Sequence, residues 1–195
     1  VNYFKSMALN KNIVYNTTLA NGRVNKVTLD VNDALDHAFF IFVYTNNPDG
    51  RFHTKRWNAN YFDLNRDNSY QTQPETRIVT EQIAKWSPLS FLDLHGFDRN
   101  FLIEPTTPPH DPNLEYDLVI DSMLEQAKAM GEAGIANTKY DFYHIPYEEH
   151  QKAMTDPNYV SKGTATNWDD ASPAYTAVFA THHGALGHTL EATEN

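Results

Sequence analysis

The sequence predicts an α/β fold, an α/β/α sandwich around a mixed, mostly parallel sheet. The run Ala38–Tyr44 is continuously apolar, which is typical of a strand in a sheet that is covered on both faces. Strand-like runs then alternate with segments of helical periodicity, as they do in α/β proteins. A chain of 195 residues is long enough for one such core, so residues 1–195 are expected to form a single domain.

The first half of the chain supplies two strands and one helix. Residues 46–50, Asn-Asn-Pro-Asp-Gly, predict a turn after the first strand. Residues 73–86 predict a helix, with Pro and Glu in its first turn and an apolar stripe beyond them. Residues 91–95, Phe-Leu-Asp-Leu-His, predict a second, short strand that ends at His95.

The second half supplies two helices and a late strand. After a proline-rich loop, apolar residues recur at helical spacing from Leu114 to Met130, and Gly131 and Gly134 are expected to end that helix. A short helix is predicted at Glu148–Met154. The last predicted element is a strand at Leu186–Ala192.

Composition narrows the classes of function. A net charge of −10 argues against a nucleic-acid partner, because clustered Lys and Arg bind the phosphate backbone, and against an anionic membrane surface. The longest apolar run is far shorter than a membrane span. The absence of cysteine excludes disulfides, thiolate catalysis and cysteine-ligated zinc. A metal site would therefore have to use the nine histidines and the carboxylates.

The late strand raises a question about metal ligands. His188 and Glu191 form a His-x-x-Glu pattern, a spacing at which two side chains can share one zinc ion. On a strand, residues i and i+3 point to opposite faces and cannot both reach one metal. On a turn the pair could still act together. The strand-like sequence favours a role for Glu191 alone, with His188 as a bystander.

Three segments together resemble one known family. They are residues 47–68, which contain Asn-Pro-Asp-Gly and Asp-Leu-Asn-Arg-Asp; residues 74–97, which contain Pro-Glu-Thr and Phe-Leu-Asp-Leu-His-Gly; and residues 184–192, which contain His-Thr-Leu-Glu. In this order they resemble the zinc carboxypeptidases of the carboxypeptidase A-like family, over most of the chain from Phe39 onward. The resemblance implies a carboxypeptidase-like fold, a zinc cofactor and hydrolysis of the C-terminal bond of a peptide that has a free terminal carboxylate.

The resemblance also implies roles for single residues. His95 matches a zinc-binding histidine, and Asp63 matches the acid that holds another zinc-ligating histidine. Glu191 matches the general base that activates water and then protonates the leaving amine. Arg56 matches the arginine that polarises the scissile carbonyl. The alternatives from the residues alone are a turn-capping Asp63 and a solvent-exposed Arg56 without a catalytic role.

Substrate recognition is assigned in the same way. Asn65 and Arg66 match the pair that binds the substrate's terminal carboxylate, and a guanidinium fork fits a carboxylate in a bidentate manner. A salt bridge of Arg66 to Asp63 or Glu75 is the structural alternative. The tyrosine that closes over the substrate is matched by Tyr159, with Tyr175 as a rival. Thr166 is the loosely aligned match to the residue that sets side-chain preference.

One departure from the family concerns its other zinc ligands. Their His-x-x-Glu motif is expected before the Asn-Pro-Asp-Gly turn, and residues 1–46 contain only His37. The chain is therefore expected to begin downstream of that motif and to supply one zinc ligand. The lack of cysteine and the short loops resemble bacterial, secreted members. The alternatives are an inactive domain that binds peptides or glycans, and a deacylase of acyl-amino acids.

Overall fold

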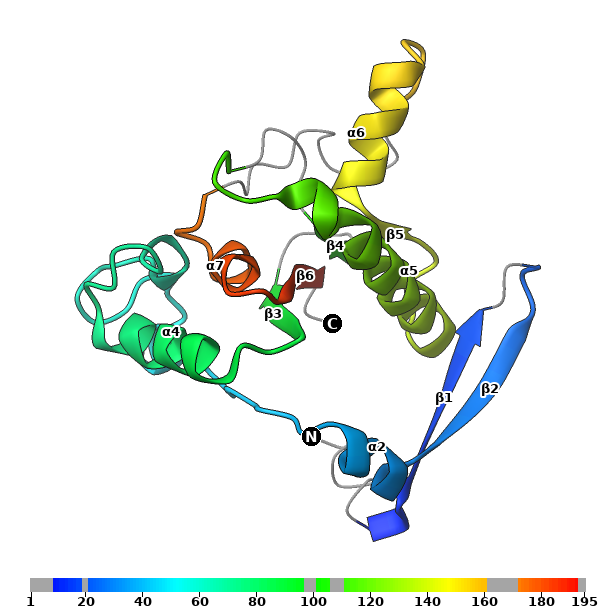
Figure 1. Ribbon diagram of the computed structural model, residues 1–195, viewed down its shortest axis with the longest axis horizontal. Helices are drawn as coiled ribbons and strands as arrows, with labels where there is room; N and C mark the ends of the chain where they lie inside the picture. Colours follow the sequence, from blue (N-terminus) through cyan, green and yellow to red (C-terminus); the bar gives the residue numbers. More distant parts are fainter. Residues whose placement is uncertain (1–8, 19–20, 97–100, 106–110, 161–171, 193–195) are drawn as a thin grey trace.

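A four-stranded sheet lies between helices, and a two-stranded hairpin lies at one side of the molecule (Figure 1). The computed structural model describes residues 9–18, 21–96, 101–105, 111–160 and 172–192. In chain order the elements are β1 (Asn12–Thr18), β2 (Val24–Asp30), α2 (Val31–His37), α3 (Pro48–His53), the 3₁₀ turn η1 (Leu64–Arg66), α4 (Pro74–Trp86), β3 (Ser90–Gly96), β4 (Phe101–Ile103), the 3₁₀ turn η2 (Tyr116–Leu118), α5 (Ile120–Asn137), β5 (Tyr143–His144), α6 (Pro146–Thr155), α7 (Thr176–His182) and β6 (Leu186–Ala192).

The sheet is mixed. Its strand order is β3-β6-β4-β5, in which β3 and β6 are parallel, β6 and β4 antiparallel, and β4 and β5 parallel. Two of its three pairings are therefore parallel, and the predicted α/β class with a mixed sheet is confirmed. The strands predicted at residues 91–95 and Leu186–Ala192 are present as β3 and β6, and the helix predicted at residues 73–86 is α4.

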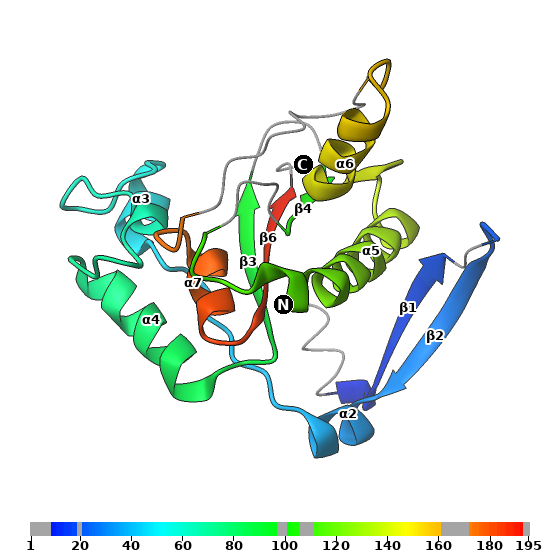
Figure 2. The same ribbon diagram turned by 45° about the horizontal axis from the view of Figure 1, so that its top comes forward.

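Helices cover both faces of this sheet. On one face, Val79 of α4 and Ala180 of α7 cluster with Phe91 of β3. On the other face, Ala127 of α5 belongs to a cluster that includes Leu190 of β6. Figures 1 and 2 show α4 and α7 on one side of β3 and β6, and α5 on the other. Within the described ranges, no helix is both long and apolar enough to cross a bilayer.

The predicted strand at Ala38–Tyr44 is wrong. The segment pairs with none of the described strands, and its side chains from Phe39 to Tyr44 are 45–82% exposed. The rings of Phe40, Phe42 and Tyr44 instead stack on one another along the segment, at centroid distances of 6.4 and 6.5 Å. Apolar content predicts burial, but a strand also needs a neighbouring backbone for its N–H and C=O groups.

The turn predicted at residues 46–50 is the start of a helix. Asn47 caps α3, because its Oδ1 accepts the Gly50 N–H at 2.8 Å, and Pro48 occupies the first helical position. Both residue types favour a helix N-terminus as well as a turn. The Asn47 side chain also contacts the segment that follows α3, because its Nδ2 donates to the Arg56 carbonyl at 3.0 Å. Asn47 therefore joins the start of α3 to the backbone of Arg56.

The glycines that were expected to end the long helix lie inside it. α5 continues to Asn137, past Gly131 and Gly134. A methyl group at Gly131 would overlap the Tyr143 ring, and one at Gly134 would overlap the Phe101 ring. These glycines therefore allow α5 to lie close to aromatic rings of the sheet, a packing role that helix-end statistics do not anticipate.

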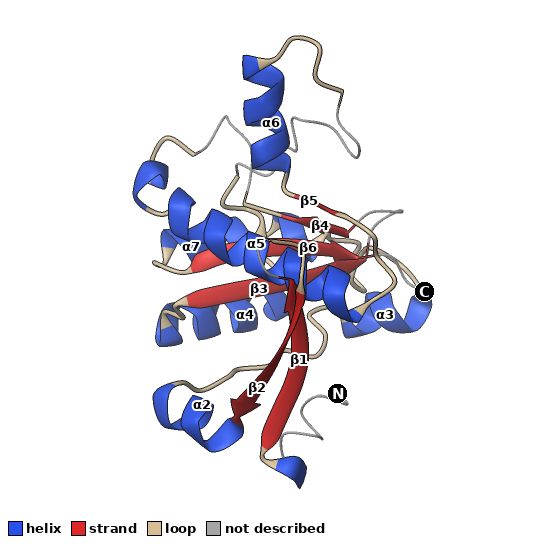
Figure 3. Ribbon diagram, turned by 90° about the vertical axis from the view of Figure 1, so that its right-hand side faces the viewer, coloured by secondary structure: helices blue, strands red, loops and turns tan. Residues whose placement is uncertain are grey.

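The β1–β2 hairpin was not predicted. Its two strands pair antiparallel over their whole length, and in Figure 3 the hairpin runs across the direction of β3 and β6. Asn137, the last residue of α5, ties it to the rest of the molecule, because its side chain accepts from the Asn16 N–H at 3.1 Å and donates to the Asn16 carbonyl at 2.7 Å. The predicted short helix at Glu148–Met154 is present as α6.

Candidate active site

Two of the predicted residues lie on neighbouring strands. The parallel register of β3 and β6 pairs His95 with Glu191, and paired residues on adjacent strands point to the same face. Phe91 has the same parity on β3 as His95 and packs against α4 and α7. His95 and Glu191 therefore face that helical layer, near the C-terminal ends of their strands.

An acid on the same strand lies beside His95. The His95 Nε2 and Asp93 Oδ2 atoms are 2.8 Å apart, and both side chains are about one quarter exposed, at 25% and 23%. A carboxylate on one ring nitrogen orients an imidazole and raises its basicity, which is the usual environment of a metal-ligating histidine. The pair is compatible with the ligand role predicted for His95.

His188 lies on the opposite face from Glu191. It is 1% exposed, its Nε2 lies 2.9 Å from the Met123 carbonyl of α5, and its Nδ1 lies 3.1 Å from the Leu186 carbonyl. Burial lowers the pKa of His188, against the opposing effect of the two carbonyls. Because the segment is a regular strand, His188 and Glu191 do not converge on one metal position.

The loop before η1 is organised by Asp63. Its Oδ1 accepts the Asn65 N–H at 3.1 Å and so caps the turn, while its Oδ2 lies 2.7 Å from Arg56 Nε. The predicted capping role of Asp63 is confirmed. Arg56 is exposed, as the non-catalytic alternative proposed, but this ion pair fixes its position.

Asn65 and Arg66 each contact the start of α7. Asn65 Oδ1 accepts hydrogen bonds from the Thr176 N–H at 2.8 Å and from the Thr176 hydroxyl at 2.9 Å. The Arg66 guanidinium lies 3.7 Å above the Tyr175 ring, and its Nη1 donates to the Asn65 carbonyl at 2.9 Å. Neither alternative salt bridge of Arg66, to Asp63 or to Glu75, is present among the described residues, where Asp63 pairs with Arg56 and Glu75 accepts from Asn58.

Two buried polar side chains directly after the Asn65–Arg66 turn hold it in place through hydrogen bonds. Asn68 is fully buried, and its Nδ2 donates to the Ala174 carbonyl at 2.7 Å and to the Thr176 hydroxyl at 3.2 Å. Asp67 is also buried, and it accepts from the Thr72 hydroxyl at 2.7 Å and from the Gln73 N–H at 2.9 Å. Burial raises the pKa of Asp67, but these hydrogen bonds together lower it below the usual value, so the carboxylate stays ionised.

The two candidate tyrosines occupy different places. Tyr175 lies against Arg66, whereas Tyr159 follows α6 and its hydroxyl is hydrogen-bonded to Glu149 of that helix. Burial and this bond raise the pKa of Tyr159 to about 12. The structure therefore brings Tyr175 rather than Tyr159 to the predicted substrate-binding pair. Thr166 lies outside the described residues.

The His95–Glu191 pair and the Asn65–Arg66 turn lie at the same end of the sheet. α4 and α7 each lead through a short turn into β3 and β6, so each helix begins at the end where its strand finishes. Figure 2 shows these helix starts and α3 towards the arrowheads of β3 and β6. In open α/β sheets ligands bind beyond the carboxyl ends of the strands. This end is therefore the candidate active site.

The described residues do not form a complete zinc site. Within residues 9–18, 21–96, 101–105, 111–160 and 172–192, no three His, Asp or Glu side chains lie close enough together to hold a metal ion. A catalytic zinc needs three protein ligands. Of the predicted ligands, His95 alone is placed by this structure, so its residues do not fit zinc by themselves.

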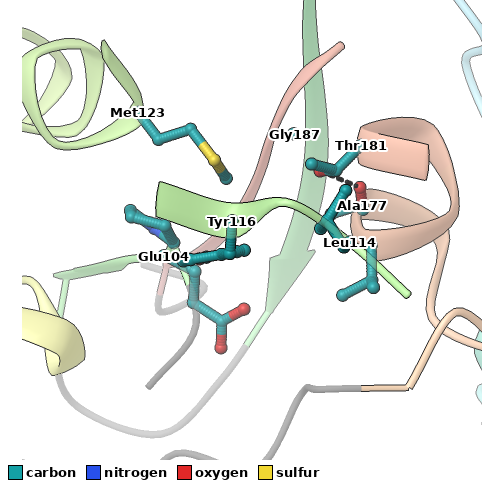
Figure 4. Close-up of a pocket in the computed structure, with 9 residues that line it drawn as sticks. Glu104, Leu114, Tyr116, Met123, Ala177, Thr181 and Gly187 are labelled. Carbon is teal, nitrogen blue, oxygen red and sulfur yellow. Dashed lines mark hydrogen bonds between the residues drawn. The ribbon is translucent and has the colours of Figure 1, made fainter. Parts of the chain in front are cut away.

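A small cavity lies beside β6 and is lined by residues of both α5 and α7. It holds about 10 Å³ and is lined by Glu104, Met123 and Thr181, among others (Figure 4). That volume suits about one water molecule and no larger ligand. Glu104 is 1% exposed there, and its main-chain N–H donates to the Thr189 carbonyl at 2.9 Å.

Comparison with known proteins gives a limited match. No family model matches the chain, and no solved structure matches it. Over 51 residues it is 43% identical to carboxypeptidase 2 of Trichophyton rubrum, and 41% identical to probable carboxypeptidase 2 of Trichophyton verrucosum (strain HKI 0517) and to carboxypeptidase 2 of Trichophyton tonsurans. Each match covers 26% of this chain and only 10% of the relative, so the chain spans about a tenth of the relatives it matches. These relatives are fungal, and bacterial origin stays a prediction.

Sequence reasoning missed Thr176 and Asn68. Asn68 directly follows the Asp-Leu-Asn-Arg-Asp motif but was given no role, Thr176 lies outside the three segments, and the two residues are 108 positions apart. The only signal was indirect, since Thr176 follows Tyr175, which was already a candidate. Their roles depend on tertiary hydrogen bonds that no spacing rule encodes.

Proposed function

We propose that this chain provides the substrate-binding and proton-transfer residues of a zinc-dependent carboxypeptidase, which hydrolyses the C-terminal peptide bond of a peptide. The observation that carries the proposal is the Asn65–Arg66 turn at the end of the sheet that also carries His95 and Glu191. The short similarity to fungal carboxypeptidases supports the same class of reaction.

Each residue has a defined task in this proposal. Arg66 and Asn65 bind the terminal carboxylate, and the stacking of Arg66 on Tyr175 keeps its guanidinium plane in place. Arg56, held by Asp63, stabilises negative charge on the carbonyl oxygen. Glu191 takes a proton from the attacking water and delivers it to the leaving amine as the C–N bond breaks. Zinc is the proposed cofactor, with His95 as this chain's ligand.

The decisive experiment compares two substrates that differ only at the C-terminus. A protein that contains this chain is given an N-acetylated dipeptide as the free acid and as the carboxamide. The free acid is expected to be cleaved at least ~100-fold faster, because the carboxamide loses a charge-assisted bidentate contact. Equal rates for acid and amide would contradict the assigned role of Arg66. Binding of the acid without cleavage would indicate a peptide-binding domain instead.

A further inference from the structure

The orientation of the Asn65 side-chain amide is fixed by Thr176. The Thr176 main-chain N–H, 2.8 Å from Asn65 Oδ1, can only donate, so the atom that faces it must be the amide oxygen. The Thr176 hydroxyl lies 2.9 Å from the same oxygen. A flipped amide would place its NH₂ group against that N–H, which cannot rotate away. The Asn65 NH₂ group is therefore left for other partners, and it has none among the residues that the structure describes.

Asn68 fixes the direction of the Thr176 hydroxyl in turn. Asn68 Nδ2 lies 3.2 Å from Thr176 Oγ1, so the hydroxyl accepts from Asn68 and its own hydrogen is directed to Asn65. Asn68 is 0% exposed and Thr176 is 4% exposed. Water therefore does not compete for these bonds, and a broken one would leave a buried polar atom without a partner.

These hydrogen bonds from Asn68 to Thr176 and from Thr176 to Asn65 determine which hydrogen-bonding groups a ligand meets. Asn65 offers the two hydrogens of its NH₂ group, and the Arg66 guanidinium is a donor without any acceptor. A carboxylate has only acceptor oxygens and matches both residues. A carboxamide would set its own NH₂ group against donors and leave one of them unpaired.

We infer that Thr176 is a positioning residue: by holding the Asn65 amide with its NH₂ group outward, it makes the Asn65–Arg66 turn specific for a carboxylate and unfavourable for a carboxamide. The inference rests on the proposed function, because it assumes that this turn meets the C-terminus of a peptide. It adds that selectivity depends on a residue that does not touch the ligand.

The test measures equilibrium binding, so that it does not depend on turnover. N-acetyl-glycyl-phenylalanine and its carboxamide are titrated into the full chain and followed by NMR, including the side-chain NH₂ resonances of Asn65. The unsubstituted chain is expected to bind the acid at least ~10-fold more tightly than the amide, with the Asn65 NH₂ resonances shifting only for the acid.

Three variants separate positioning from general stability. Thr176→Val keeps the shape and the main-chain donor but removes the hydroxyl, and it should weaken acid binding ~3- to 10-fold while leaving amide binding unchanged. Thr176→Ser should restore the acid preference. Asn65→Asp can still accept both Thr176 bonds, so the turn remains formed, but its second oxygen repels a carboxylate; acid binding should fall by more than ~10-fold.

The outcomes distinguish the inference from the proposed function. If the unsubstituted chain binds neither ligand, or binds acid and amide equally, the carboxylate role fails and both ideas fall. If it prefers the acid and Thr176→Val keeps that preference, the inference alone is wrong. A Thr176→Val variant that weakens both ligands equally would mean a structural role. Should that variant not fold, the Asn65 NH₂ resonances of the unsubstituted chain decide, because an amide held by Thr176 with its NH₂ group outward must respond to the acid and not to the amide.

Discussion

Asp63 uses its two carboxylate oxygens for different partners. One oxygen caps the turn that carries Asn65, and the other pairs with Arg56, whose side chain is 56% exposed. An ion pair this exposed contributes at most about 1 kcal/mol to stability, so its main effect is to set the position of Arg56. Arg56 and Asn65, which are nine positions apart, are thus both positioned by Asp63.

Glu191 is the residue whose substitution tests the chemistry most directly. Glu191→Gln keeps the side-chain volume at a position that is 7% exposed, but removes the group that carries the proton. We expect turnover of a peptide acid to fall ~100- to 10,000-fold, because general acid–base catalysis contributes about that much.

The control for Glu191→Gln is the same change at Glu148. Glu148 is on α6, away from the candidate site, and it pairs with Lys128 of α5 at 2.7 Å. Loss of this ion pair should leave turnover within about twofold of the unsubstituted chain. Both variants should unfold at similar urea concentrations. Retained activity in Glu191→Gln would remove this residue from the proposed mechanism.

The candidate site could be predicted where its residues are close in sequence. Arg56, Asp63, Asn65 and Arg66 lie within eleven positions, and the structure places Asp63, Asn65 and Arg66 on one turn, to which Arg56 is joined by its ion pair with Asp63. The supporting contacts to Thr176 cross more than a hundred residues, and their geometry depends on how α7 lies against the sheet. Such contacts are a product of tertiary packing and leave no local pattern.

Among the elements, the strands that were predicted correctly are those with a partner. β3 and β6 pair with each other along their whole length, and their bounds follow the apolar runs in the sequence. Ala38–Tyr44 is more apolar than either, yet it is unpaired in the described sheet. The β1–β2 hairpin shows the reverse case, because none of its described strand residues is fully buried, and the strands are held by mutual pairing and by Asn137. Hydrophobicity therefore predicts where a strand could be buried, and not whether a partner is there.

The contact between β6 and α5 predicts how stability depends on pH. His188 joins these elements, and burial lowers its pKa; His144 on β5 has a pKa lowered by burial too, against an opposing effect of Glu149. In the unfolded chain a histidine has a pKa of ~6.5, so below that pH the unfolded state binds more protons than the folded state. The free energy of unfolding should therefore fall as pH drops below ~6.5, by up to ~1.4 kcal/mol per pH unit for each histidine.

Urea unfolding between pH 5 and 8 measures this slope. His188→Gln removes one of the two histidines that take up a proton on unfolding. It should therefore reduce the pH dependence of the free energy of unfolding, whatever it does to stability at neutral pH. His53→Gln, at an exposed position on α3, is the matched control for the loss of one histidine. Stability that rises towards pH 5 in the unsubstituted chain would mean that the two buried rings are charged when folded.

Across the whole molecule, the described sheet is covered unevenly. α5 packs over β4, β5 and β6, while β3 forms the edge of the described strand order and leaves Leu92 and Leu94 at 42% and 69% exposed. His95 therefore lies on an edge strand, with Asp93 as its partner along the strand and Glu191 as its neighbour across it. His95 is the one predicted zinc ligand at this end of the described sheet, and its acidic neighbours do not form with it a group that could hold a metal ion.

That arrangement predicts weak zinc binding by the 195-residue chain. A catalytic zinc site needs three protein ligands, and the described residues bring no such group together, so we expect a dissociation constant no tighter than ~10 μM. Competition with a zinc-sensitive dye measures this value. His95→Asn should weaken the binding further, whereas His53→Asn, on the exposed surface of α3, should not. Tight one-to-one binding that survives His95→Asn would place the metal on residues outside the candidate site, and tight binding that His95→Asn abolishes would mean that this chain completes the zinc site by itself.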